Sequence, residues 1–306
     1  QAITEAHHRF LLSGADVITT ATYQASVQGF VTHLGMSAER ARELLMSGVH
    51  LAREVVKKFG SGNTGPLVAG SIGWYGAYLH DTSEYTGTFA EKMTVEELKD
   101  WHLTQVEGLL AAGADLLAFE TIPSIKEAKA VVELLAEFPD SSAWLSFSCK
   151  DEKHISDGST FAEAVEVASR SAQLLAVGVN CCSPTVVEPL LDSASSQLSP
   201  DTSWVVYPNS VRMGEAGSRS DRYDELPSLP VTRCFFCSVF PEPGFVLPGG
   251  CCCISPAEIT ELRKNFIHSC SLDRESGDLT GSWKVEEDGC VQIRVLRPPE
   301  AGFVDW

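Results

Sequence analysis

Residues 114–121 read ADLLAFET, a near-continuous apolar run that ends in a carboxylate and a hydroxyl. Such runs are typical of strands buried on both faces, as in parallel sheets. Helical patterns flank the run on both sides. Residues 94–112 begin at Thr94 with Glu97 three positions later, which is a capping box, and residues 124–137 begin at a serine. The segment therefore predicts one helix–strand–helix unit.

The same alternation continues in both directions along the chain. Six further strands are predicted: ADVITTATY (15–23), PLVAGSIG (66–73), AWLSFSCK (143–150), LLAVGVNC (174–181), SWVVYPNS (203–210) and GFVLPGG (244–250). Further helices are predicted at the start of the chain, ending at Gly14, and over residues 37–59, 159–173, 184–195 and 255–268. Strands that alternate with helices indicate βαβ units and a parallel α/β sheet.

Seven strands preceded by a helix favour a TIM-type (β/α)8 barrel that lacks its first strand. A doubly wound open sheet is the alternative, although no G-x-G-x-x-G motif follows any predicted strand. We predict a catalytic barrel domain over residues 1–270, with an irregular segment at 213–243 before the last strand. Residues 271–306 form a C-terminal tail to which the sequence assigns no role.

Composition restricts the class of partner. The 306 residues include 41 acidic and 23 basic side chains, a net charge of −18. Such a field repels phosphates, so nucleic acid and anionic membrane surfaces are not expected partners. No apolar run approaches the roughly 18 residues of a membrane span, and the first residues lack the pattern of a signal peptide. Ten cysteines, several of them adjacent, indicate a reducing compartment. We expect a cytoplasmic enzyme that acts on small molecules.

Two cysteine clusters stand at the ends of predicted strands. Three adjacent cysteines at 251–253 follow two glycines, and Cys181 and Cys182 end another strand. A disulfide between neighbours is strained, whereas strand ends that meet at one barrel mouth can bring distant sulfurs together. Three thiolates without a fourth protein ligand leave the open position that a catalytic zinc requires. The alternative is that these cysteines are small buried apolar residues.

Six stretches carry a resemblance to a known family. GADVITTATYQAS, GADLLAFETIPSIKEA, VGVNC and GGCC resemble the homocysteine S-methyltransferase family, and VVYPNS and SIGWYGAYLHDTSEYTG resemble its members that use sulfonium donors. The resemblance covers roughly residues 1–211 and 244–268. It implies a (β/α)8 barrel with one Zn²⁺ bound by three cysteines, which by matching motifs are Cys181, Cys251 and Cys252. It gives Cys182 and Cys253 no role.

The resemblance also implies an activity and a substrate site. Methyl transfer from S-methylmethionine or S-adenosylmethionine to homocysteine would form methionine, a step of methionine biosynthesis. Glu120 would hold the substrate amino group, Tyr23 would lie beside the substrate, and Asn209 would lie near the metal. Read from the residues alone, a solvated strand-end carboxylate is the alternative for Glu120, and a core or turn role is an equal alternative for Tyr23 and Asn209. The oligomeric state stays open.

The sequence departs from the family pattern in ways that keep two other hypotheses open. The family opens with a strand that ends in Asp-Gly-Gly, which this sequence does not contain, and residues 213–243 replace a helix. The second hypothesis is therefore an inactive or weakly active relative that serves as a zinc or amino-acid binding module. The third is a thiol–disulfide oxidoreductase that uses Cys234 and Cys237, which have the C-x-x-C spacing of a redox pair.

Overall fold

A computed structural model describes residues 1–60, 65–79, 92–209, 246–252 and 254–272. Its core is a seven-stranded sheet in which every strand pairs in parallel with the next one along the chain, in the order β1-β2-β3-β4-β5-β6-β7. The strands are β1 (Val17–Thr19), β2 (Leu67–Gly73), β3 (Leu116–Ile122), β4 (Ala143–Phe147), β5 (Leu174–Asn180), β6 (Ser203–Tyr207) and β7 (Val246–Pro248). All seven predicted strands are confirmed in type and order.

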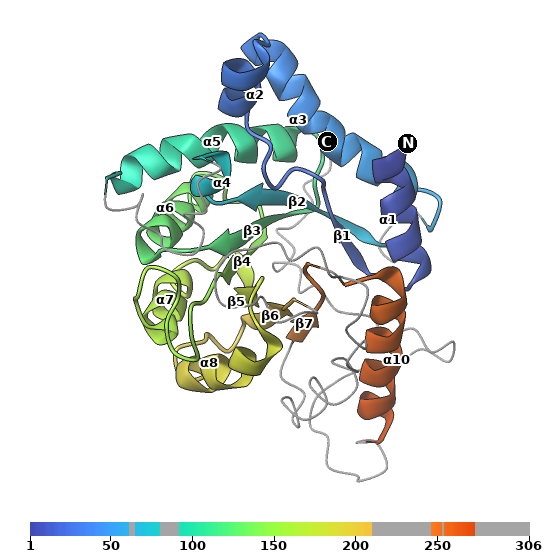
Figure 1. Cartoon of the computed structure of the whole chain (residues 1–306), viewed down its shortest axis with the longest axis vertical. Helices are drawn as coiled ribbons and strands as arrows, with labels where there is room; N and C mark the ends of the chain where they lie inside the picture. Colours follow the sequence, from blue (N-terminus) through green and yellow to red (C-terminus); the bar gives the residue numbers. More distant parts are fainter. Residues whose placement is uncertain (61–64, 80–91, 210–245, 253, 273–306) are drawn as a thin grey trace, which may run out of the picture.

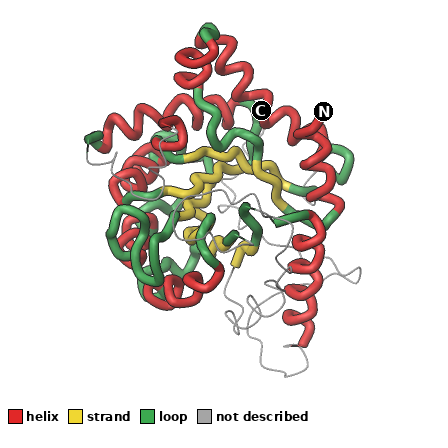
Figure 2. The backbone as a smooth tube through the Cα atoms, viewed as in Figure 1, coloured by secondary structure: helices red, strands yellow, loops and turns green. Residues whose placement is uncertain are grey.

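The helices lie on the outside of a curled sheet (Figure 1). They are α1 (Ala2–Leu12), α2 (Val27–Leu34), α3 (Ala38–Val56), α4 (Gly76–Leu79), α5 (Val95–Ala111), α6 (Ile125–Leu135), α7 (Phe161–Ala168), a 3₁₀ turn η3 (Pro184–Val186), α8 (Val187–Ala194) and α10 (Pro256–Leu272). The tube in Figure 2 shows the strands gathered inside this layer of helices. Among the described strands, β1 and β7 each have one neighbour, so the sheet is a curled parallel half-barrel.

Helix starts follow the capping chemistry that the sequence predicts. Thr94 and Thr160 each form a complete capping box with the glutamate three residues later. Helix α2 was not predicted, although Ser26 caps its start and Gly35 ends it in a left-handed conformation with φ of 63°. The signal was present in the sequence, but eight residues form little more than two turns, too few to give a clear apolar period.

The strands alternate between two packing environments, and this alternation decides which side chains reach the inside of the curl. In β3, Leu117 and Phe119 pack against the helices, whereas Leu116 and Ala118 face a smaller inner cluster with Trp144 and Tyr207. Side chains along a strand alternate with a period of two. Glu120 therefore continues the inner face, and the sheet delivers its carboxylate to the concave side.

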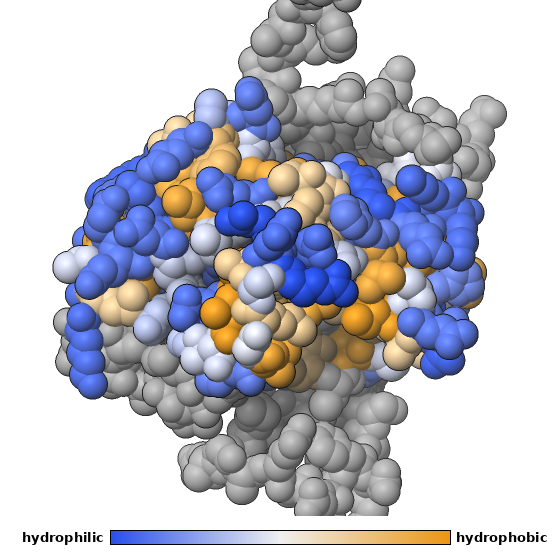
Figure 3. All heavy atoms as spheres, turned by 90° about the horizontal axis from the view of Figure 1, so that it is seen from above, coloured by the Kyte–Doolittle hydropathy of each residue, from blue (hydrophilic) through white to orange (hydrophobic). Residues whose placement is uncertain are grey.

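Figure 3 looks from above onto the region of α2 and α3, where the described surface is mostly hydrophilic with apolar patches between the charged side chains. Three large apolar side chains are exposed in the described parts of the chain: Ile3, Leu12 and Leu34. None of the described helices is both long enough and apolar enough to cross a membrane. The predicted irregular segment at 213–243, the tail from residue 273 onwards, and Cys234 and Cys237 lie outside the described residues.

Gly178 allows β5 and β6 to lie close together, and we expect Gly178→Ala to destabilise the fold strongly. A Cβ at this position would lie 1.9 Å from the backbone carbonyl oxygen of Val205. A backbone atom cannot rotate away, so β6 would have to shift, at a cost of about 3 kcal/mol or more. The free energy of unfolding in urea measures this loss.

Gly108→Ala is the matched control for this substitution. Its Cβ would meet only the flexible end of the Leu45 side chain, at 3.0 Å, and alanine favours the helix by about 1 kcal/mol. We expect a change of less than about 1 kcal/mol in the same assay. Equal losses in the two variants would contradict the close approach of β5 and β6.

Candidate metal and substrate site

The structure brings three predicted cysteines together at the carboxyl ends of the strands. Cys181 follows β5 directly, and Cys251 and Cys252 follow β7. The Sγ atom of Cys252 lies 4.0 Å from that of Cys181 and 4.0 Å from that of Cys251. All three sulfurs lie within 4.8 Å of one another, and no other set of three such residues does so in the described parts of the chain.

Local backbone geometry places each sulfur. Cys181 has a positive φ of 50°, and its N–H donates to the Tyr207 carbonyl at 3.3 Å, which ties the end of β5 to the end of β6. The N–H of Cys251 donates to the Pro208 carbonyl at 3.0 Å, so the turn after β7 is fixed against the same strand. The neighbouring Gly250 is required by this turn, because a Cβ there would lie 2.2 Å from the Ile254 side chain.

The sulfur spacing fits a tetrahedral metal site. Zinc–thiolate bonds of about 2.3 Å in tetrahedral geometry separate two sulfurs by about 3.8 Å, close to the two separations of 4.0 Å. Hydrogen bonds from Cys181 and Cys251 lower the pKa of Cys252 to about 3, and the pKa of Cys181 is correspondingly raised. The cluster therefore holds one thiolate readily, and soft thiolate ligands favour zinc over hard cations.

The two other clustered cysteines behave differently. Cys182, next in the chain to Cys181, is 4% exposed and belongs to the main apolar core. Burial raises the pKa of its thiol to about 12, so it does not supply a thiolate at neutral pH. Cys253 lies outside the described residues.

Glu120 stands on the inner face of β3 and shares a cavity with Cys251. The cavity has a volume of about 540 Å³, and Trp144, Tyr207 and Gly250 also line it. The Ser71 hydroxyl donates to the Glu120 carboxylate, and Tyr207 also contributes a side-chain hydrogen bond. Burial raises the pKa of Glu120, and these two hydrogen bonds only partly oppose the shift. A cation that entered the cavity would pair with the carboxylate and so offset the free-energy cost of ionising it there.

Tyr23 and Asn209 lie at the same end of the sheet. Burial raises the pKa of the Tyr23 phenol, with a further contribution from Cys181 and Glu120, so the hydroxyl stays protonated and lies near both residues. The side chains of Thr121 and Trp74 bond to this hydroxyl. Asn209 is 5% exposed, its N–H donates to the Cys182 carbonyl at 3.0 Å, and its Oδ1 atom is buried without a hydrogen-bond partner.

An acceptor without a partner is costly when buried, so this oxygen suits a ligand or a metal ion.

Three residues of this region were not predicted from the sequence: Ser71, Tyr207 and Asn180. Tyr207 is the most informative, because its hydroxyl lies within hydrogen-bond distance of Ser146 and accepts from the Trp144 indole N–H at 3.0 Å. These contacts orient the phenol beside Glu120. Side chains alternate along β6, and Tyr207 occupies an inward-facing position, which could have indicated this role. The position of Ser71 depends on the register between β2 and β3.

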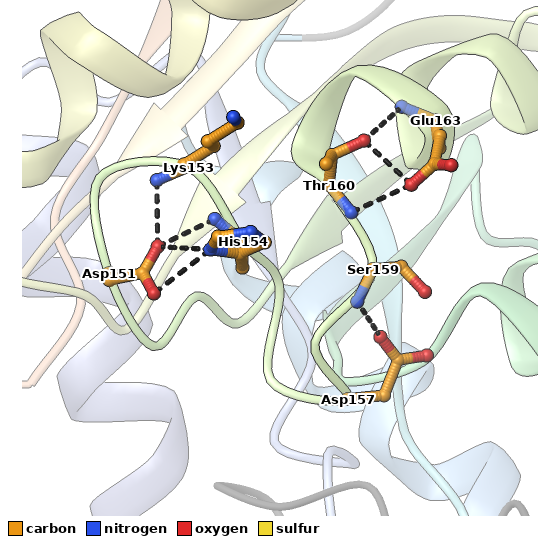
Figure 4. Close-up of polar contacts among 7 residues, drawn as sticks. All are labelled: Asp151, Lys153, His154, Asp157, Ser159, Thr160 and Glu163. Atoms are coloured by element: carbon orange, nitrogen blue, oxygen red, sulfur yellow. Dashed lines mark hydrogen bonds and ion pairs between the residues drawn. The ribbon is translucent and has the colours of Figure 1, made fainter.

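The loop after β4 contains a histidine–carboxylate pair that resembles catalytic machinery but stabilises the loop (Figure 4). Asp151 Oδ1 accepts the backbone N–H groups of Lys153 and His154 at 2.9 and 2.8 Å and lies 2.9 Å from His154 Nδ1. Further along, Asp157 accepts from the Ser159 N–H at 2.8 Å before the capping box of α7. Both carboxylates are engaged in local turns, which is the usual use of aspartate in loops.

Comparisons with known proteins identify relatives of this chain. The sequence profile of the homocysteine S-methyltransferase family matches residues 1–266. Betaine-homocysteine S-methyltransferase of Drosophila melanogaster is 42% identical over 86% of this chain and 83% of its own length. Homocysteine S-methyltransferase YbgG of Bacillus subtilis is 36% identical over 86% of this chain and 82% of its own length.

A solved structure is similar as well. The metallated form of the homocysteine methyltransferase MmuM from Escherichia coli superimposes with a TM-score of 0.72 at 34% identity, covering 85% of this chain and 83% of that one. The match of the family profile over most of the chain, together with relatives above 30% identity, establishes the relationship. The chain belongs to the homocysteine S-methyltransferase family, and it is a homocysteine methyltransferase enzyme.

Proposed function

We propose that the protein transfers a methyl group from a sulfonium donor, S-methylmethionine or S-adenosylmethionine, to homocysteine, with one Zn²⁺ held by Cys181, Cys251 and Cys252. The observation that carries the proposal is the convergence of these three sulfurs within 4.8 Å beside the cavity that contains Glu120. A metal site and a carboxylate side by side match the two ends of homocysteine, its thiol and its ammonium group. A (β/α)8 barrel that lacks its first strand remains part of this proposal.

The chemistry requires a thiolate at neutral pH. A free alkyl thiol has a pKa of about 8.5, so only a few per cent is ionised at pH 7. Cys181, Cys251 and Cys252 would hold the Zn²⁺ ion, which would supply the Lewis acidity that displaces the thiol proton to solvent and keeps the sulfur nucleophilic. The sulfur lone pair then forms a bond to the donor methyl carbon, and the electrons of the breaking C–S bond stay on the donor sulfur, which becomes a neutral thioether.

The chain's own residues bind and orient the substrate. Glu120 accepts hydrogen bonds from the ammonium group of homocysteine. Ser71 and Tyr207 hold the Glu120 carboxylate in place. Tyr23, kept protonated by burial, offers a hydroxyl near both Glu120 and Cys181. Positioning of this kind lowers the entropy that must be lost in the reaction.

The test is an assay of purified protein with Zn²⁺, homocysteine and one donor at a time: S-methylmethionine, S-adenosylmethionine or betaine. We expect methionine from at least one sulfonium donor. Betaine is included because a relative at 42% identity is a betaine-homocysteine S-methyltransferase. If methionine formed from betaine alone, the methyl donor would be a quaternary ammonium compound and not a sulfonium compound. One equivalent of bound zinc without turnover from any donor would favour a zinc or amino-acid binding module.

A further inference from the structure

Two residues next to the proposed site have an unusual backbone conformation. Thr121 and Cys181 have φ values of 61° and 50°, and they are the only non-glycine residues with positive φ in the described parts of the chain. This conformation is disfavoured for a β-branched threonine in particular. Such outliers persist only where the surrounding structure enforces them, and they concentrate at functional sites.

Asn180 supplies the contacts that hold Thr121. Its Oδ1 accepts the Thr121 N–H at 2.8 Å, and its Nδ2 donates to the Thr121 hydroxyl oxygen at 2.8 Å. Asn180 is 1% exposed, so water cannot replace these bonds. The Thr121 hydroxyl group also bonds to Tyr23. One buried amide therefore fixes both the backbone N–H and the hydroxyl group of a strained residue.

The strained residue lies in an irregular part of β3, directly after Glu120. The register between β3 and β4 shifts between Phe119 and Ile122, so this segment is irregular. A bulge of this kind aims the side chains beside it differently from a regular strand. The Glu120 carboxylate is thus placed by the segment that Asn180 holds. Asn180 also directly precedes Cys181, so one side chain connects the proposed ammonium site to the proposed metal site.

We propose that Asn180 is a positioning residue that fixes the spacing between the Glu120 carboxylate and the Cys181 sulfur, and that this spacing selects homocysteine over cysteine. The inference deepens the proposed function and rests on it. Cysteine carries the same ammonium and thiol groups but is one methylene shorter. A rigid separation between the two anchor points can accept one length of amino thiol, whereas a loose one accepts both.

The experiment compares wild type with Asn180→Ala. We expect Asn180→Ala to weaken zinc binding about 10- to 100-fold, the usual effect of removing a residue that orients a ligand. Zinc affinity is measured by competition with a chromophoric chelator, independently of turnover. We also expect KM for homocysteine to rise at least about tenfold, and the ratio of kcat/KM for homocysteine to that for cysteine to fall by a similar factor.

Gln173→Ala is the matched control. Gln173 directly precedes β5 at the opposite end of the strand, where its Nε2 donates to the Phe138 carbonyl at 2.6 Å. We expect this variant to lose thermal stability while zinc affinity, KM and the preference for homocysteine stay within twofold of wild type. A general loss of stability in β5 would instead move both variants together, which would overturn the inference.

A second substitution tests the mechanism by rescue. Glycine adopts a φ of 61° without strain, so Thr121→Gly no longer needs Asn180 to hold its backbone. We expect kcat/KM of the double variant Asn180→Ala/Thr121→Gly to be at least about fivefold higher than that of Asn180→Ala. A gain of this size lies within the range expected from relieving the backbone strain of one residue. If Asn180→Ala does not fold, Asn180→Asp keeps an acceptor for the Thr121 N–H and loses the donor, and a smaller change in the same direction is expected.

The outcomes separate this inference from the proposed function. Asn180→Ala with wild-type zinc affinity and an unchanged preference for homocysteine would overturn the positioning role while leaving the methyltransferase intact. A double variant no better than Asn180→Ala would overturn the explanation through backbone strain. Wild-type protein that binds no zinc and forms no methionine would instead remove the proposed function itself.

Discussion

Replacing Cys181 by alanine is expected to abolish zinc binding and to lower the rate of methyl transfer at least about 1,000-fold. Cys181 supplies one of three sulfurs that lie within 4.8 Å of one another, and it comes from a different strand than the other two. Two remaining thiolates leave half of a tetrahedral site to weakly held ligands. The lost rate corresponds to about 4 kcal/mol of transition-state stabilisation.

Metal content per chain after dialysis and initial rates of methionine formation measure the two effects. We expect about one zinc per chain in wild type, because one set of three cysteine ligands holds one ion, and a small fraction of this in Cys181→Ala.

Cys182→Ala is the control, because it removes the same atom from the next residue. Its thiol is buried in the apolar core, where burial raises its pKa to about 12. We expect a loss of about 1 kcal/mol in the free energy of unfolding with zinc content and activity retained. If Cys182→Ala lost zinc and Cys181→Ala kept it, the assignment of ligands would be wrong.

Glu120→Gln is expected to lower kcat/KM for homocysteine about 100-fold while leaving the folded protein as stable as wild type or more so. Glutamine keeps the shape and the acceptor for Ser71, but it does not pair with an ammonium ion. The loss of a buried charge pair costs about 2–5 kcal/mol. The effect should appear mainly in KM for homocysteine, because the ammonium group is bound equally in the ground state and the transition state.

The stability effect has a definite sign and pH dependence. Burial raises the pKa of Glu120 in the folded protein, so the ionised carboxylate costs more in the folded state than in the unfolded chain. Below the unfolded pKa the carboxyl group is neutral in both states, and wild type and variant should melt alike. As the pH rises past that value, wild type loses stability relative to Glu120→Gln. Thermal melts at pH 4 and pH 8 measure the difference.

A variant that is less stable than wild type at pH 8 would show that Glu120 serves the fold rather than a ligand. Ser71→Ala is the companion variant, because it removes one donor to the carboxylate. We expect it to raise the pKa of Glu120 further and to weaken homocysteine binding less than Glu120→Gln does.

The sequence predicts the central strands well because β2, β3, β4 and β5 are buried on both faces. The run at 114–121 needs no knowledge of its partners, since apolar residues on both sides of a strand are sufficient to indicate its environment. Cys181 and Cys252 are 71 residues apart, yet the sequence could predict that their sulfurs meet. In a parallel barrel the carboxyl ends of all strands lie at the same end. The same arrangement places Glu120, Tyr23 and Asn209 at that end.

Register and backbone strain could not be read from the sequence. Ser71 reaches Glu120 because Gly73 pairs with Glu120 across β2 and β3, and no local pattern specifies that pairing. Thr121 is an ordinary strand residue by propensity, and its left-handed backbone is imposed by the amide of Asn180 from 59 residues away. Tertiary contacts determine such positions, which explains why Ser71 and Asn180 were not predicted, whereas the strand order was sufficient to predict that Cys181, Cys251 and Cys252 lie together.

Strand β7 consists of only three residues, and β6 is its one partner among the described strands. Short edge segments exchange their backbone amides through brief local openings long before a domain unfolds. An ion shared by Cys181 and the two cysteines after β7 would cross-link this edge to the interior of the sheet. Metal uptake and release would then proceed through fraying of one strand, and loading the ion would stabilise this short edge of the sheet.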